Sequence, residues 1–298
     1  MHKEPITSKL NLSGVFGNNI ITKNSSLIGG VSLSGLDPVG LSDDKFELYT
    51  DLFRGIIQLL PNGAVLHQYY VHHKGKKLVA EKRNYNKVDI ISSNRMSFLN
   101  DRGLYESFIN HFVELPTPTN LNNFADLSFL STALAAIFDK DARRIFTASI
   151  SNRKATILRR SELEDTHHKL CNEINQYKDK LGLFSFENTV MNANNIWSFM
   201  RFICNLDPTY LENNEKAPTA NWDSLLMAGE VAISTIGGNQ YLKISGAKVV
   251  YARIASITEF GGKYTPVGAF ASGDRPAVLS DGNYIIQQQF KPFSRLDK

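Results

Sequence analysis

Cysteine, net charge and long apolar runs are all scarce in this sequence of 298 residues. Its two cysteines, Cys171 and Cys204, are too few for a disulfide framework or a four-ligand zinc site, so we expect two buried thiols in a reducing compartment. The net charge of +4 is too small to require nucleic acid or an anionic membrane as a partner. The longest mainly apolar stretch, residues 127–138, is too short to span a bilayer.

The sequence also lacks a signal peptide and a phosphate-binding loop. Residues 1–12 carry three charged side chains and have no apolar core, so we expect the chain to stay on the cytoplasmic side. The nearest match to a phosphate loop is Gly261-Gly262-Lys263, but Ile257 and Tyr264 stand where the motif needs Gly and Ser or Thr. We therefore expect no nucleotide hydrolysis, no catalytic residue and no bound cofactor on this chain.

Two halves of the sequence each predict a β-hairpin followed by a helix. In the first half, residues 19–22 and 27–33 predict a hairpin, residues 42–60 an amphipathic helix that ends before Pro61, and residues 65–72 a strand. We expect a long loop over residues 74–87, a short helix over residues 101–112 and a linker over residues 115–124.

The second half predicts a hairpin over residues 145–158 and a helix that begins with a capping box at Ser161 and ends at Gly182. A strand at residues 183–187, a helix at residues 192–204 and a polar loop at residues 207–222 follow. Four further strands are expected, at residues 230–236, 241–244, 249–257 and 284–290.

These patterns predict an α/β (α+β) fold of β-hairpin–helix–strand sandwich units with a β-rich C-terminal part. The chain is long enough for one large domain or for two subdomains, over residues 1–125 and 126–298.

Two groups of histidines suggest a metal site, but neither has suitable spacing. His67, His72 and His73 lie near one strand, and His67 and His72 should point to opposite faces because they are five residues apart. His167 and His168 are adjacent on a helix, without a supporting carboxylate pattern. We expect surface or half-buried histidines and no bound metal.

Basic residues gather around the second predicted hairpin. The candidate surface residues of this group are Arg143, Arg144, Arg153, Lys154, Arg159 and Arg160. Such a cluster can hold phosphates of DNA, but no aromatic residues are interleaved for base stacking. A solvated face or a protein-docking patch is the favoured interpretation.

Five segments, taken in order, resemble the N-terminal region of the conjugative-transfer (type IV secretion) ATPases of the TraC/TrbE type. A hairpin runs from Ile20 to Gly35-Leu36-Asp37, and a helix, a proline turn and a strand with a basic exit follow over residues 43–74. A helix then ends in Asp207-Pro208, a strand occupies residues 248–257, and Gln288-Gln289-Phe290-Lys291-Pro292 closes the region.

The resemblance implies a non-catalytic docking domain over residues 1–298, on a protein whose motor domain, with ATP and Mg²⁺, is absent here. It also implies inner-membrane secretion components and further copies of the ATPase as partners, and a cytoplasmic position at the inner membrane. The chain is then a piece of a longer ATPase or a stand-alone homologue without ATPase activity. We expect docking through Ile20 and Ile28 of the first hairpin or through the late β region. The alternatives are an unrelated α/β protein-interaction module and a nucleic-acid-binding protein that uses the basic hairpin.

Overall fold

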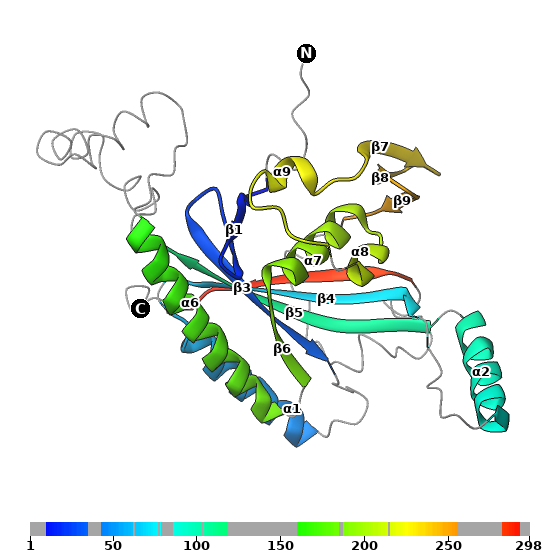
Figure 1. Ribbon diagram of the computed structural model, residues 1–298, viewed down its shortest axis with the longest axis horizontal. Coiled ribbons are helices and arrows are strands. Elements are labelled where there is room, and N and C mark those ends of the chain that lie inside the picture. The colour runs from blue at the N-terminus through cyan, green and yellow to red at the C-terminus, as the bar shows by residue number, and fades with distance from the viewer. Residues whose placement is uncertain are drawn as a thin grey trace, which may run out of the picture.

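The computed structural model describes residues 10–34, 43–61, 63–76, 78, 86–102, 104–117, 160–184, 187–213, 215–254 and 282–292. It is an α+β fold of helices and antiparallel sheets with a β-rich C-terminal part, which confirms the predicted fold class. A seven-stranded sheet forms the centre, and a separate three-stranded sheet lies beside it (Figure 1).

The predicted first hairpin is present. β2 (Asn19–Ile21) pairs antiparallel with β3 (Ser26–Ser34), and β1 (Gly14–Phe16) extends the sheet beyond β2. The connection turns at Ser25, whose φ of 68° is left-handed. Hydrogen bonds between Thr22 and Ser26 close this turn, so the hairpin is fixed locally.

The strand order is β1-β2-β3-β5-β4-β10, with β6 also paired to β3. α1 (Asp43–Gln58) and β4 (Val65–Lys76) follow the hairpin as predicted, and β4 continues four residues past the predicted end. β4 does not neighbour β3, because β5 (Leu104–Pro116) lies between them. The expected helix over residues 101–112 was therefore wrong, since most of that segment is a strand.

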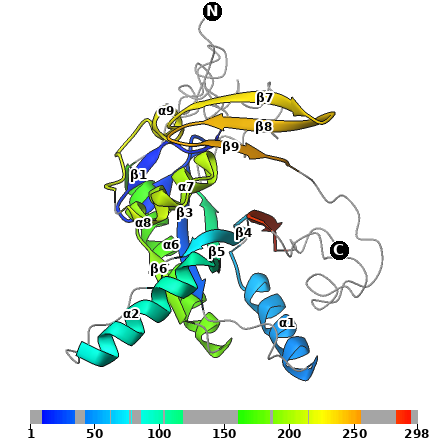
Figure 2. The same ribbon diagram turned by 90° about the vertical axis from the view of Figure 1, so that its right-hand side faces the viewer.

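A helix that the sequence did not predict interrupts the β4–β5 hairpin. α2 (Asn86–Asp101) stands away from the sheet at the far end of these two strands (Figures 1 and 2). Asn100 bonds both backbone groups of Leu78, and Arg102 lies 4.3 Å over the ring of Phe98. Ile90, Ile91 and Phe98 remain more than half exposed, so α2 adds little to the core.

The predicted second-half helix is α6 (Arg160–Leu181), which passes into the 3₁₀ turn η3 (Gly182–Phe184). It begins one residue before Ser161, so Ser161 lies inside the first turn and not at the predicted cap. The following strand is β6 (Glu187–Met191), which begins where the expected strand over residues 183–187 was to end. The predicted apolar stripe of α6 is buried, at Leu163, Leu170, Ile174, Tyr177 and Leu181.

The next helix, α7 (Ala193–Asn205), matches the prediction closely. Asn192 and Asn195 form a reciprocal capping box at its start, and Leu206 ends it in a left-handed conformation. The expected polar loop contains one short helix, α8 (Thr209–Glu212), and a second, α9 (Trp222–Leu225), begins at its last residue. Trp222 is fully buried and its indole nitrogen donates to the Pro218 carbonyl oxygen, so this segment is packed against the body of the fold.

All four predicted late strands are found among the described residues. β7 (Glu230–Ile236), β8 (Asn239–Ser245) and β9 (Val249–Ala252) form the small sheet, and β10 (Tyr284–Phe290) pairs with β4. β9 ends five residues before the expected residue 257.

Helices cover both faces of the large sheet. α1 and α6 pack on one face, over Leu27, Leu66 and Val113, while α7 to α9 pack on the other, over Ile20 and Phe112 (Figures 1 and 2). Strands from both sides of residue 125 share this sheet; the two-subdomain division stays a prediction. None of the helices that the structure describes has the length and apolar character needed to cross a membrane.

Candidate docking surface

The residues predicted for a docking surface fall in three different places. Arg143, Arg144, Arg153, Lys154 and Arg159, like Lys263, lie outside the described residues, and Arg160 is the first residue of α6.

Ile20 and Ile28 do not form a docking surface. Ile20 has no exposed area, and Ile28 packs against the same core, beneath α7. Both belong to the face of the hairpin that meets the helix, since the hairpin is an internal part of the sheet. Of the two apolar surfaces predicted for docking, the late β region remains.

The small sheet β7–β9 has an apolar patch on one face, next to the polar pair Thr235–Gln240 of the same face. Its register aligns two rows of three residues across the strands, and every member of both rows is apolar. The rows are Val231–Ile244–Val250 and Ile233–Leu242–Ala252. Because side chains alternate along a strand, the opposite face carries Lys243 and Ser245, together with Ile236, Tyr241 and Tyr251.

The apolar face is covered at one end and open at the other. Ile244, in the first row, is buried, whereas Ile233, in the second row, is 73% exposed. Ile254, two residues beyond β9, is 78% exposed. An amphipathic three-stranded sheet normally buries its apolar face against another layer, so this open end is the best candidate for a contact with another protein.

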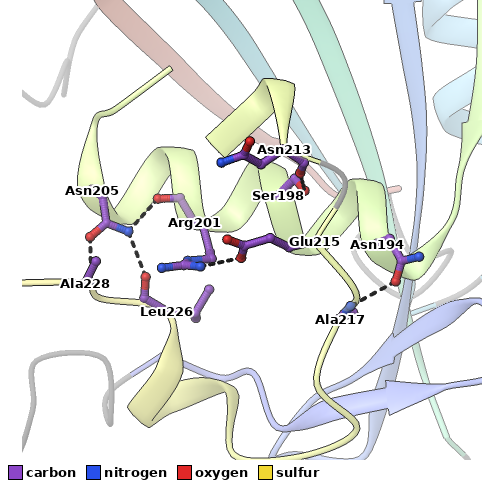
Figure 3. A network of polar contacts seen from close by, with 9 residues as sticks. All are labelled: Asn194, Ser198, Arg201, Asn205, Asn213, Glu215, Ala217, Leu226 and Ala228. Atoms are coloured by element: carbon purple, nitrogen blue, oxygen red, sulfur yellow. Dashed lines mark hydrogen bonds and ion pairs between the residues drawn. The ribbon is translucent and has the colours of Figure 1, made fainter. Parts of the chain in front are cut away.

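A buried asparagine holds the base of the small sheet on α7. The Asn205 amide nitrogen donates to the carbonyl oxygens of Arg201 and Leu226, both at 2.8 Å, and its oxygen accepts from the Ala228 N–H at 2.8 Å (Figure 3). Ala228 lies two residues before β7. One side chain thus connects the helix directly to the segment that enters the small sheet.

Other side chains of α7 fix the connection between the helix and this segment. Asn194 accepts from the Ala217 N–H at 2.9 Å, and the Ser198 hydroxyl donates to the Asn213 carbonyl oxygen at 3.0 Å (Figure 3). Arg201 forms an ion pair with Glu215. These contacts span the whole connection, so the small sheet is presented from a firmly held base.

The histidines of β4 lie on both faces of the sheet, as predicted for His67 and His72. His67 contacts Glu114 at 3.2 Å, whereas His72 bonds Ser107 at 2.7 Å on the other face. His73 is buried, contrary to the expected surface or half-buried position, because it packs against Phe202 of α7. Within the described residues, no three His, Cys, Asp or Glu side chains are grouped as a metal site.

A cysteine, a histidine and an asparagine that the sequence analysis did not connect meet beside the first hairpin. The Cys171 sulfur lies 3.9 Å from His167 Nε2, and the Asn19 amide nitrogen lies 2.9 Å from His167 Nδ1. Burial and the neighbouring His168 lower the pKa of His167, so its ring is neutral near pH 7. Nδ1 then accepts from Asn19 and Nε2 carries the proton, which leaves no free ring nitrogen to deprotonate the thiol.

A second polar chain runs beneath α6. The Tyr177 hydroxyl donates to His111 Nδ1 at 2.7 Å, and His111 Nε2 donates to the Gln68 oxygen at 2.9 Å. The Gln68 amide continues the chain to Gln288 on β10 at 3.0 Å. Burial lowers the pKa of His111 to about 3, so the neutral ring has one donor and one acceptor, and both are used.

No protein-family model matches this sequence, and no curated protein matches it either.

Proposed function

We propose that this chain is a docking and scaffold domain of a conjugative-transfer (type IV secretion) ATPase. In this role it binds inner-membrane secretion components and neighbouring copies of the ATPase, on the cytoplasmic side and peripheral to the membrane. A motor domain outside this chain hydrolyses ATP with Mg²⁺, and these 298 residues contribute no catalysis.

The observation that carries the docking role is the open apolar face of the small sheet. The row Ile233, Leu242 and Ala252 lies between the row of the buried Ile244 and the polar pair Thr235–Gln240. Burial of such a face contributes about 25 cal/mol per Å² of apolar area, which is a driving force for protein association. The assignment to the secretion ATPases rests on the ordered sequence segments that resemble that family.

Replacement of Ile233 by Asp tests this surface. Because Ile233 is 73% exposed, the variant should fold normally, but a carboxylate would have to lose its water on docking. We expect at least a tenfold loss of the protein from the inner-membrane fraction of cells that carry its transfer system, and a parallel fall in transfer frequency. Tenfold corresponds to about 1.4 kcal/mol of binding free energy.

Ser234→Asp is the matched control. It adds the same charge on the same strand but on the opposite face, so recruitment should stay at the wild-type level. A photo-crosslinking residue at position 233 identifies the partner directly. Normal recruitment of Ile233→Asp, or a crosslink to a protein unrelated to secretion, would argue against the proposal.

A further inference from the structure

In the part of the chain that the structure describes, no helix covers one face of the large sheet at its far end. Of the described helices, α1 and α6 cover this face near Leu66, Val113 and Phe290. β4, β5 and β10 continue past these helices toward the end of the sheet where α2 stands (Figure 1). Tyr70 lies on this continuation and belongs to neither core cluster. His72 and Tyr284, which are opposite each other in the register, lie there too.

Three rings on this open end form a column across the strands. The His72 ring stacks on Tyr105 of β5, with centroids 4.8 Å apart and planes at 7°, and on Tyr284 of β10 at 4.9 Å and 24°. These spacings match the distance between neighbouring strands, so each ring stands upright on its own strand. Tyr70 bonds Tyr284 and lies at 5.9 Å from it, which supports that end of the column.

The column has an accessible end. Tyr105 is 42% exposed and stacks on a single ring among the described residues, so one of its faces is available. β3 pairs with β5 only as far as Ile109, and Tyr105 lies four residues further along β5. The described strands therefore leave the outer side of Tyr105 without a neighbour in the sheet.

The charged side chains of β4, β5 and β10 are divided between the two faces of the sheet. Exposed Lys74 lies opposite Tyr105 in the register, on the same face as the ring column. The two carboxylates of these strands, Glu106 and Glu114, point to the other face, where they contact His73 and His67. The open end thus combines aromatic rings, amide and hydroxyl groups and a positive charge, with no carboxylate from these strands.

We propose that this ring column binds single-stranded nucleic acid by stacking a base on Tyr105, with Lys74 beside the adjacent phosphate. Base stacking on aromatic side chains is tolerant of sequence, and a sheet face with exposed rings is a common platform for single strands. The site uses none of the basic residues near the second predicted hairpin. It does not depend on the docking role of the small sheet.

Fluorescence anisotropy with a labelled oligothymidylate of about 15 nucleotides, a length that covers one small binding site, tests the proposal on the whole chain. Tyr105→Ala should weaken binding about five- to hundredfold, the effect of removing one stacked base, whereas Tyr105→Phe should keep it within about twofold. Tyr251→Ala removes a similarly exposed tyrosine from the small sheet and should change nothing. Circular dichroism of each variant verifies that it is folded.

Two further measurements distinguish a single-stranded nucleic acid from other possible ligands. Thymidine monophosphate should compete only at concentrations far above those of the oligonucleotide; equal potency would mean a mononucleotide site and would overturn the assignment. The affinity should fall only shallowly with salt, by about one logarithmic unit per tenfold change, because few lysines contribute. Unchanged binding by Tyr105→Ala, a much steeper salt dependence or no binding at all would also overturn it.

Discussion

A single buried histidine makes the stability of this protein depend on pH. Burial lowers the pKa of His111 to about 3, whereas the unfolded chain has the ordinary value near 6.5. Between these values the unfolded state takes up a proton that the folded state does not. The stability that depends on a neutral His111 is therefore present in full above pH 6.5 and is lost as the pH falls toward 3.

We expect the free energy of unfolding to fall by about 2 kcal/mol between pH 7.5 and 5 from His111 alone. Urea denaturation at several pH values measures it, in a range above most carboxylate titrations. His111→Gln has no ionisable ring and should lose most of this slope. A remainder is expected from His72 and His167, whose pKa values are also lowered by burial. An equal slope in wild type and variant would contradict the assignment.

At the scale of elements, Asn205 determines how firmly the small sheet is held. Asn205→Ala removes three hydrogen bonds and leaves the Leu226 carbonyl and the Ala228 N–H without that partner. A buried polar group left unsatisfied costs about 1–3 kcal/mol, so we expect about 2 kcal/mol of destabilisation. Hydrogen exchange should speed up in α9 and β7–β9 before it changes in β3 or β5.

Asn205→Asp is the informative comparison. The carboxylate can still accept from Ala228 but cannot donate to Leu226, so protection should be lost mainly at α9. Uniform acceleration over the whole fold in both variants would mean that Asn205 supports global stability and not the base of the small sheet.

The elements that sequence patterns predicted well are those with one buried face. The stripe of α6 follows this rule. The pattern over residues 101–112 predicts a helix, although β5 occupies most of it, because helices cover both faces of this sheet and Phe108-Ile109 and Phe112-Val113 are adjacent apolar pairs. Pairs three to four residues apart imitate the period of a helix. α2 was missed because its apolar residues form no clear stripe.

The candidate site was predictable only in part. The late strands could be recognised one by one, but the apolar face of the small sheet depends on their register. Ile20 was misplaced because an apolar strand gives no sign of which neighbour will cover it. The contacts of Asn19 with His167 and of Gln68 with Gln288 join residues 148 and 220 positions apart, and no local pattern carries that information.

At the scale of the whole molecule, α2 contributes none of its described side chains to the buried core. β4 and β5 pair up to Lys76 and Leu104, so a two-residue Asn-Gly turn can replace residues 77–103. We expect the shortened protein to unfold in one transition with a Tm within about 4 °C of wild type, since little core is lost.

Differential scanning calorimetry measures this, with Leu66→Ala as the reference for real core damage. Leu66 is fully buried, and its truncation should cost about 2–5 kcal/mol. If the deletion instead lowers the Tm as much as Leu66→Ala does, or removes the cooperative transition, α2 is part of the folding unit.

The position of β10 has a consequence for synthesis on the ribosome. β10 pairs with β4 from Tyr284–His72 to Phe290–Leu66, although more than 200 residues separate the two strands in the chain. At 5–20 residues per second, the edge of β4 waits roughly 10 to 40 seconds for its last neighbour. During that interval the nascent chain exposes an unpaired strand edge, the kind of surface that chaperones shield from other nascent chains.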